Sequence, residues 1–292
     1  MSTSRYELRD KVILITGGTG GIGSATAQEL LRRGARLAVA DLDPRTPQIG
    51  AALSSTSAMG VIADVRDRAS LDAAVDAVVD RFGRLDVAIA NAGILARTGT
   101  LRTTPVSSVE SLLAVNVTGV VNTVQAAMDQ VIAQRGQFAL ISSVFAFANG
   151  MGTLPYAMTK AAVEQLGRGL RVELANHGVS TLIAYFSMVH TAMITQGVDG
   201  DPLADRLLAT MPQTMLKRIA PETAATAIAD GLARRSPTVF APSRWKPLSA
   251  LRGLVNPLLD SRMSRDPRTQ AALSALDART ATDTTAESKG TR

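Results

Sequence analysis

The chain has 292 residues, of which 46% are hydrophobic and 19% are charged, so a wholly disordered protein is excluded. It contains no Cys and only two His, which excludes disulfides, thiol nucleophiles and Cys- or His-rich metal centres. The N-terminal residues carry charges where a signal peptide needs an apolar segment, and no uninterrupted apolar run reaches the length of a membrane helix. We therefore expect a cytoplasmic protein without a metal site.

The formal net charge of +6 is unevenly distributed. Residues 234–268 hold eight basic and two acidic side chains, so the rest of the chain is formally neutral. Aromatic side chains are not interleaved with these basic residues, as they are in many nucleic-acid-binding segments. We therefore expect no nucleic-acid partner.

Short apolar runs alternate with segments of helical periodicity along the chain. The expected strands are 11–16, 35–41, 60–65, 85–90, 137–142, 180–186 and 238–241, and the expected helices are 21–33, 47–53, 70–82, 107–133, 156–176 and 222–234. Strands that alternate with helices pair in parallel through right-handed crossovers. The sequence thus predicts an α/β protein with a three-layer, doubly wound Rossmann-type sheet of about seven strands. This single domain covers residues 1–242 and includes a substrate lid at about 190–220.

Residues 243–276 mix leucines with Arg and Lys and predict a basic amphipathic extension. Pro247 and Pro257 are expected to break any long helix in it. We expect the extension to be buried against the domain, with contact to a partner subunit or to an anionic membrane surface as the alternatives. Residues 277–292 are rich in Thr, Ala and Ser and predict a disordered tail.

A glycine-rich turn, residues 16–23, lies between the first expected strand and the first expected helix. Glycines let the backbone approach a pyrophosphate closely, and the helix N-terminus offers free N–H groups. A glycine-rich sequence at such a junction is typical of a dinucleotide-binding turn.

Asp41 ends the second expected strand. A carboxylate there accepts hydrogen bonds from the hydroxyls of an adenine ribose and repels a 2′-phosphate. No Arg or Lys lies in the turn or directly after Asp41 to hold such a phosphate. The sequence therefore favours NAD(H) over NADP(H), the alternative being that Asp41 only caps a loop.

Six motifs, in this order, resemble those of the short-chain dehydrogenase/reductase family: Thr16-Gly17-x-x-x-Gly21-x-Gly23, Asp64-Val65, Asn91-Ala92-Gly93, Asn116, Ser143 and Tyr156-x-x-x-Lys160. The resemblance covers about residues 8–242. It implies an oligomer, a homodimer or homotetramer built on the helices around 107–133 and 156–176. The residues that it assigns to the dinucleotide are Gly17, Thr19, Gly21, Ile22, Gly23, Asp41, Leu42, Asp64, Val65, Asn91, Ala92, Gly93, Tyr156, Lys160, Val189 and Thr191.

Tyr156 and Lys160 are four residues apart on an expected helix and share one face of it. A free phenol has a pKa of about 10, and a neighbouring ammonium group stabilises the phenolate. The pair therefore predicts Tyr156 as the general acid or base, with Ser143 donating to the substrate oxygen. The resemblance adds that Lys160 holds the nicotinamide ribose and that Asn116 binds a water of a proton relay.

The segment after the sixth expected strand departs from the family pattern. Phe186 and Ser187 stand where the family has Pro-Gly, whereas Thr191 is retained. The Cβ of Ser187 is expected to shift the nicotinamide ring or the loop. His190 is expected to be a solvated surface residue.

Apolar residues before Tyr156 and after Thr191 predict a bulky, uncharged substrate such as a steroid, terpenoid or alicyclic alcohol or ketone. The alternative is that they only pack a lid helix. The expected substrate contacts are Phe145, Met151, Met188 and Met193, with Phe147, Leu154, Ile194, Met211, Met215 and Leu216 as further candidates.

These features together predict an NAD(H)-dependent oxidoreductase, a short-chain alcohol dehydrogenase or carbonyl reductase that interconverts a secondary alcohol and a ketone. The alternative from another class is a non-catalytic NAD-binding sensor or assembly subunit of the same fold. Among enzymes, epimerases and dehydratases of this fold stay open.

Overall fold

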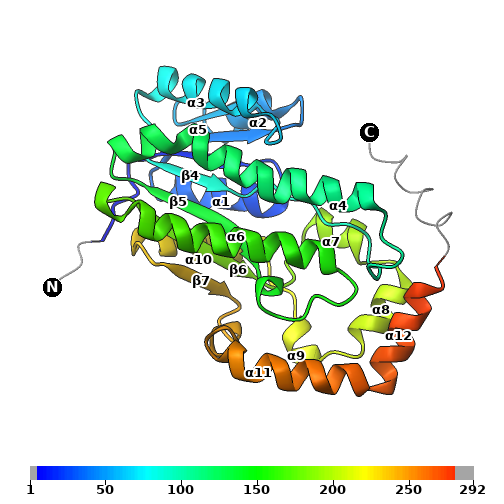
Figure 1. Cartoon of the computed structure of the whole chain (residues 1–292). Coiled ribbons are helices and arrows are strands. Elements are labelled where there is room, and N and C mark those ends of the chain that lie inside the picture. Colours follow the sequence, from blue (N-terminus) through cyan, green and yellow to red (C-terminus); the bar gives the residue numbers. More distant parts are fainter. Residues whose placement is uncertain (1–4, 280–292) are drawn as a thin grey trace.

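Seven parallel strands form one sheet in the computed structural model, which describes residues 5–279 (Figure 1). The strands are β1 (Val12–Thr16), β2 (Arg36–Asp41), β3 (Ala58–Ile62), β4 (Val87–Ala90), β5 (Gln137–Ser143), β6 (Ser180–Phe186) and β7 (Thr238–Ala241). Their order across the sheet is β3-β2-β1-β4-β5-β6-β7. The predicted Rossmann-type fold is therefore confirmed.

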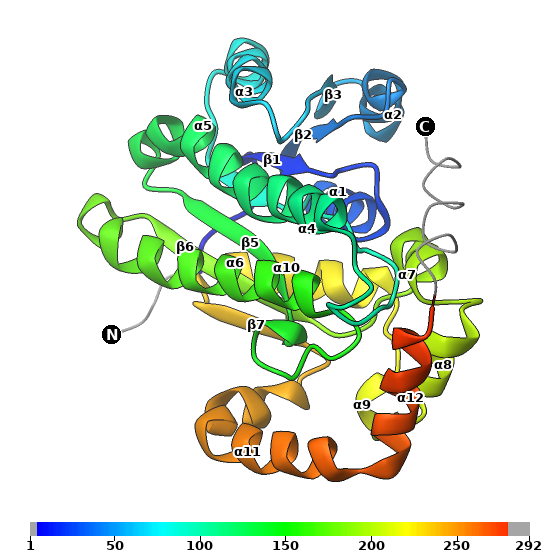
Figure 2. The same ribbon diagram turned by 45° about the vertical axis from the view of Figure 1, so that its right-hand side comes forward.

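Both faces of the sheet are covered by helices, and the central strands are accordingly apolar on both sides. Helices α1 (Gly21–Arg32), α2 (Thr46–Leu53) and α10 (Pro221–Ala233) lie on one face, and α3 (Arg68–Phe82), α5 (Gly119–Ala133) and α6 (Leu154–Glu173) lie on the other. In Figure 2, α5 and α6 lie in front of the sheet, and the fainter α1 and α10 lie behind it.

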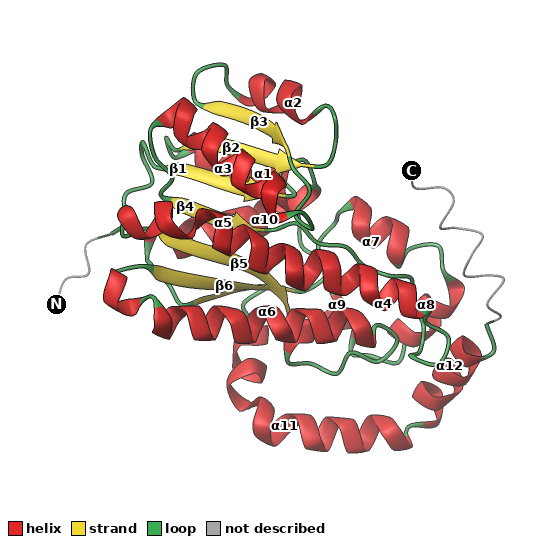
Figure 3. Cartoon of the chain, turned by 45° about the horizontal axis from the view of Figure 1, so that its top comes forward, coloured by secondary structure: helices red, strands yellow, loops and turns green. Residues whose placement is uncertain are grey.

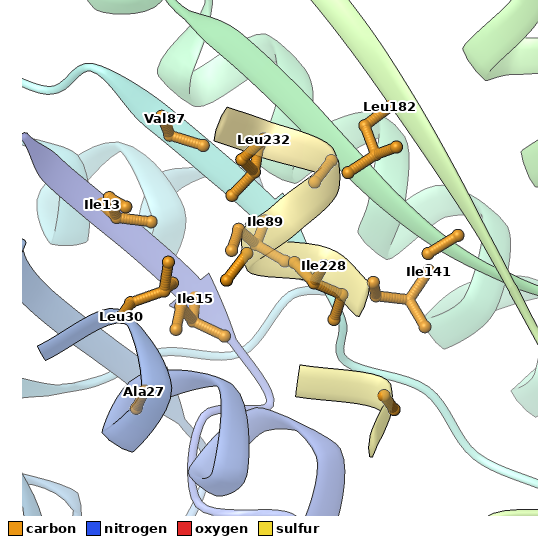
Figure 4. Close-up of a cluster of buried hydrophobic side chains, with 14 of the residues drawn as sticks. Ile13, Ile15, Ala27, Leu30, Val87, Ile89, Ile141, Leu182, Ile228 and Leu232 are labelled. Carbon is orange, nitrogen blue, oxygen red and sulfur yellow. The ribbon is translucent and has the colours of Figure 1, made fainter. Parts of the chain in front are cut away.

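The two cores divide the side chains of each strand by their alternation. In β1, Ile13 and Ile15 face the α1 and α10 side, whereas Val12 and Leu14 face the α3 and α5 side. Figure 4 shows the first of these cores, in which the isoleucines of β1 and β4 meet side chains of α1 and α10. This packing fixes the position of the β1–α1 turn relative to the end of β4.

A long helix precedes β5. It is built from α4 (Val106–Leu113), a π-helical turn (Ala114–Thr118) and α5, and by length and composition residues 106–133 could cross a membrane. Val120, Val124, Ala127 and Val131 of this helix instead pack in the core against the sheet. This packing accounts for part of its apolar composition, whereas Val106 and Leu113 of α4 are exposed.

Three short helices occupy the segment predicted as a substrate lid: α7 (Ala192–Gly197), α8 (Pro202–Leu208) and α9 (Gln213–Leu216). They lie between β6 and α10 in the chain. In space they lie beyond the carboxyl ends of the strands (Figure 1).

The residues after β7 form an arm of two helices, α11 (Trp245–Arg265) and α12 (Pro267–Asp277). Figure 3 shows the arm outside the layered domain, with α12 beside α8. The expectation that two prolines break a long helix is wrong. Pro247 lies in the first turn, where N–H groups have no helical partner, and Pro257 removes only one donor from the helix interior.

The predicted burial of the extension is correct for its beginning and for α12, where Ala272 and Leu276 are buried, but not for most of α11. Trp245 is buried and Leu248 packs against the same aromatic cluster. Leu251, Leu254 and Leu258 are 53%, 74% and 73% exposed, because α11 runs away from the sheet and leaves its outer face to solvent.

The predicted disordered tail begins too early. α12 extends to Asp277 and packs Ala272 and Leu276 against Leu207 of α8. Arg279 forms an ion pair with Asp201, with 2.7 Å between Nη2 and Oδ1, and the two side chains are 5% and 10% exposed. The remainder of that predicted tail, residues 280–292, lies outside the described residues.

Replacing Arg279 tests whether the ion pair holds the arm. Removing one partner of a buried pair leaves the other charge less well compensated. Among the described residues, Asp201 then keeps the backbone N–H of Leu203 at 3.1 Å and Arg97 at 3.3 Å. We expect Arg279→Ala to lower the free energy of unfolding by about 2–4 kcal/mol in urea denaturation. The control Arg265→Ala removes an exposed side chain and is expected to change it by less than about 0.5 kcal/mol. Equal effects of the two variants would contradict this role.

Candidate active site

A cavity of about 390 Å³ opens at the carboxyl ends of the strands. It lies where the strand order reverses between β1 and β4, the usual ligand position in open parallel sheets. All sixteen residues that the family resemblance assigns to a dinucleotide line this cavity. The structure therefore brings together residues that are far apart in the sequence.

The turn after β1 is shaped by its glycines. Gly17 has φ +64°, and a Cβ there would lie 2.8 Å from the Cα of Ala92. A Cβ on Gly23 would lie 2.2 Å from the carbonyl oxygen of Gly17. The side-chain amide of Asn91 donates to the carbonyls of Thr16 and Gly17 at 3.0 and 2.9 Å. Asn91 therefore braces the turn, and no larger side chain fits at these glycines.

Asp41 reaches the same turn from the end of β2. Its Oδ2 accepts hydrogen bonds from the backbone N–H and the hydroxyl of Thr19, at 3.0 and 2.6 Å. Arg45, four residues further on, is paired with Asp43 at 2.7 Å. Arg66, beside the expected adenine contacts, is paired with Asp64 at 2.6 Å, and the hydrogen bond from Arg66 lowers the pKa of Asp64. Both cations are thus already neutralised.

Lys160 is a buried ammonium group. Its Nζ donates to the carbonyl of Ile141 at 3.0 Å and lies 5.6 Å from the ring centroid of Tyr156. Burial lowers the pKa of Lys160 to about 8. Sequence reasoning missed the role of Ile141, because a backbone acceptor on a strand has no side-chain signature.

Tyr156 stands beside Lys160 on the first turns of α6, and Phe145 packs edge-on against its ring. Burial raises the pKa of Tyr156 to about 12, and a hydrogen bond with Ser143 lowers it by less. For the protein alone, the predicted acidification of the phenol is therefore wrong, since desolvation of the anion outweighs the hydrogen bond with Ser143.

Ser143 is the last residue of β5. Its hydroxyl donates to the carbonyl of Phe186 at 3.3 Å and accepts from the N–H of Phe145 at 3.2 Å. The neighbouring strand and the following turn thus fix its side chain next to Tyr156.

Asn116 lies in the π-helical turn of the long helix and is fully buried. Such turns are frequent at functional sites. Its amide N–H groups donate to the carbonyl of Ile94 and the hydroxyl of Thr159, and its oxygen accepts from the N–H of Ile94. Asn116 therefore joins the loop after β4 to α6. It lies near Lys160, since a Cβ on Gly93 would lie 3.3 Å from the Oδ1 of Asn116 and 3.6 Å from the Nζ of Lys160. Its part in a water relay stays a prediction.

A second, apolar cavity of about 90 Å³ adjoins the first, and Tyr156 lines both. The four expected substrate contacts line it: Phe145, Met151, Met188 and Met193. Ile194, Met211 and Leu216 line it as well. No charged side chain is among its lining residues in the described part of the chain.

Three further candidates lie elsewhere. Phe147 is buried in an aromatic cluster with Tyr185 and Trp245. Leu154 is 40% exposed on the first turn of α6. Met215 lines a neighbouring, larger cavity. Apolar character alone does not separate a pocket wall from a core or a surface position.

The loop after β6 connects the two cavities. Ser187 lines both of them, and its backbone N–H donates to the carbonyl of Ala241 at 3.2 Å. Phe186 is buried in the core, and Thr191 lies against Gly21 of the turn. His190 is exposed, as predicted.

A family model for short chain dehydrogenase matches residues 11–201. Among similar proteins, 2-(R)-hydroxypropyl-CoM dehydrogenase of Xanthobacter autotrophicus is 33% identical over 210 residues, which cover 70% of this chain and 84% of that protein. Fluoren-9-ol dehydrogenase of a Terrabacter species is 34% identical over 225 residues, with 66% and 62% covered.

Solved structures share the fold. Levodione reductase superposes with a TM-score of 0.72 at 24% identity, over 80% of this chain and 96% of that one. The 3-ketoacyl-(acyl-carrier-protein) reductase from Brucella melitensis, complexed with NADH, gives 0.68 at 22% identity, with 80% and 97% covered. With the family model covering well over half of it, the chain belongs to the short-chain dehydrogenase/reductase family.

The low pKa of Lys160 has a consequence for stability. The folded chain binds the proton of Lys160 less tightly than the unfolded chain does. Below about pH 8, burial of the ammonium therefore lowers the free energy of unfolding by its full amount, and this loss shrinks as the pH rises from about 8 to 10.5. We expect the free energy of unfolding of the ligand-free protein to rise by about 2–3 kcal/mol between pH 7 and 10, relative to Lys160→Met.

Urea denaturation of both proteins at the two pH values measures this difference, and the variant subtracts the contribution of the other titrating groups. Parallel pH profiles would show that Lys160 titrates normally in the folded state.

Proposed function

We propose that the protein is an NAD(H)-dependent oxidoreductase that interconverts a secondary alcohol and a ketone. The observation that carries the proposal is the position of Tyr156, which lines both the cavity of about 390 Å³ and the apolar cavity; Lys160 lines the first and Ser143 the second. An acid or base at this junction serves a substrate in one cavity and a cofactor in the other.

The cavity of about 390 Å³ at the glycine turn fits a nicotinamide dinucleotide. The N–H groups at the start of α1 and the glycine turn suit the pyrophosphate, and Asp41 suits the adenine ribose. Lys160 lines the cavity beside Tyr156, and Thr191 lines it against Gly21; the family places the nicotinamide riboside at these two residues. When bound, the nicotinamide supplies the chemistry of hydride transfer.

The side chains of the chain itself handle the proton and the charge. Ser143 orients the substrate oxygen by a hydrogen bond and stabilises negative charge that develops on it. Tyr156 takes the alcohol proton on oxidation and returns it on reduction. Lys160 keeps positive charge beside the phenol, and further positive charge from an oxidised cofactor lowers the pKa of Tyr156 from its high value in the protein alone.

Two observations support NAD over NADP. The carboxylate of Asp41 faces the turn where a 2′-phosphate would lie, and Arg45 and Arg66 are held by their own aspartates. The fold neighbour from Brucella melitensis, moreover, was solved with NADH.

The substrate that we propose is bulky and uncharged, since no described residue that lines the apolar cavity carries a charge. The name of one relative, fluoren-9-ol dehydrogenase, is consistent with such an alcohol. The presence of Ser143, Tyr156 and Lys160 together disfavours a non-catalytic sensor.

We also propose a homodimer or homotetramer that uses the outer faces of α4 and α6. Val106 and Leu113 on α4, and Met158 and Val172 on α6, are large apolar side chains that are 40% to 78% exposed. Burial in a subunit interface would remove them from water.

Replacing Tyr156 by Phe tests the mechanism. The variant keeps the ring but loses the transferable proton, so we expect kcat to fall by about 10²–10⁴-fold. NADH binding, followed by its fluorescence, should persist. Tyr6→Phe is the matched control, since Tyr6 lines neither cavity and its ring packs against Lys11 and Arg235. Unchanged turnover of Tyr156→Phe would refute the assigned role.

Replacing Asp41 by Ala tests the choice of cofactor. Loss of the carboxylate removes an acceptor for the ribose hydroxyls and a repulsion of the 2′-phosphate. We expect the ratio of kcat/KM with NAD to that with NADP to fall at least about tenfold, a difference of about 1.4 kcal/mol. Asp80→Ala, an exposed aspartate on α3, should leave the ratio unchanged. A wild-type protein that uses both cofactors equally would contradict the proposal.

A further inference from the structure

A third cavity, of about 570 Å³, lies next to the apolar cavity at Tyr156. We call it the distal cavity. Six residues line both cavities, so the two spaces adjoin at these residues: Phe145, Met151, Ser187, Met188, Met211 and Leu216.

The partition between the cavities is adaptable. Three of its six members are methionines, whose unbranched side chains change conformation at low cost and fill irregular apolar space. Rotation of Met151, Met188 or Met211 would join the distal cavity to the space beside Tyr156.

The apolar cavity is by itself too small for a bulky substrate. Its volume of about 90 Å³ is well below the roughly 300–1,000 Å³ of pockets that take drug-sized molecules. The distal cavity lies inside that range. A substrate of the proposed class must therefore use space beyond the partition.

The C-terminal arm supplies the far wall of the distal cavity. Trp245, Leu248, Leu259 and Met263 of α11 line it opposite the lid. Asp260, Arg262, Asp266 and Arg268 also line it, so its charged rim is formally neutral. Asp260 accepts a hydrogen bond from Asn149, and Asp266 accepts from Thr269. These walls suit an uncharged, largely apolar body.

Trp245 forms the buried beginning of this wall. It is 8% exposed and packs with Phe147 and Tyr185, so the arm joins the core of the domain next to the distal cavity.

The arm is fixed on both sides of this cavity. Arg252 of α11 pairs with Glu164 of α6 at 2.7 Å, and the amide of Asn256 donates to the carbonyl of Phe147 at 2.6 Å. At the far end, Arg279 pairs with Asp201. These contacts attach the far wall of the distal cavity firmly to the rest of the domain.

We propose that the distal cavity is the second half of the substrate site, and that the C-terminal arm sets the size of the substrate. The reacting carbon lies beside Tyr156, and an extended, uncharged apolar body passes the methionine partition to rest against α11. This inference rests on the proposed alcohol–ketone activity and assigns it a substrate with a long or multi-ring apolar body.

A series of unbranched 2-alkanols from 2-butanol to 2-undecanol tests the proposal with NAD as cofactor. In the wild type we expect kcat/KM to rise about three- to fourfold for each added methylene group beyond the partition, the gain from burying it. Leu259→Phe and Ala209→Phe fill the distal cavity from opposite walls. In both variants the preference for 2-undecanol over 2-butanol should fall at least tenfold.

Leu258→Phe is the matched control, because Leu258 is 73% exposed, adjacent to Leu259 and absent from the cavity wall. It should leave the preference for the long alcohol unchanged. A wild-type kcat/KM that does not depend on chain length, or an equal effect of the substitutions at positions 258 and 259, would overturn the proposal.

Trp245 provides a readout that needs no turnover, since it is the only tryptophan of the chain. We expect 2-undecanone to change its fluorescence in the wild type, and to do so more weakly in Leu259→Phe. A fluorescence response without oxidation of any alcohol would refute the proposed function and keep the distal site. Turnover of 2-butanol without a response to the long ketone would refute the distal site alone.

Discussion

All seven strands run in the same direction, and this constraint produces the site. Their carboxyl ends lie along one edge of the sheet, so residues that follow different strands meet there. Asp41 at the end of β2, Asn91 after β4, Ser143 at the end of β5 and Ser187 after β6 line adjoining cavities for this reason. The packing of β1 and β4 against α1 and α10 holds the glycine turn at the point where the strand order reverses.

Burial opposes the acid–base chemistry in the protein alone. It lowers the pKa of Lys160 to about 8 and raises the pKa of Tyr156 to about 12, so each group is driven toward its neutral form. The same water-poor surroundings strengthen the electrostatic interaction of these groups with any further charge at the site. A positively charged ring beside the pair therefore changes the pKa of Tyr156 strongly. Keeping Tyr156 and Lys160 buried in the ligand-free protein lowers the stability of the folded state.

The elements and the nucleotide-binding turn were predictable because their signals are local. Glycine at a strand–helix junction and the four-residue spacing of Tyr156 and Lys160 have steric and geometric causes that a sequence displays directly. The strands follow from apolar runs, although β3 begins two residues before the expected 60–65.

Features that depend on tertiary contacts were not predictable in this way. α11 continues through Pro257, and Arg279 is ordered by a partner 78 residues away in the sequence. Phe147 and Leu154 have the composition of pocket residues, but packing places one in the core and the other at the surface. The anchoring of Lys160 on the carbonyl of Ile141 involves a backbone atom that every residue type shares.

The placement of the arm also makes the charge distribution of the molecule uneven. Residues 243–268 carry six basic and two acidic side chains, and they form the end of the molecule that encloses the distal cavity. This end is the positive pole of a molecular dipole, while most of the domain is close to neutral. At physiological ionic strength, salt screens the electrostatic field of the arm over about 8 Å, so the field acts only on molecules close to the arm. The range increases as the salt concentration falls.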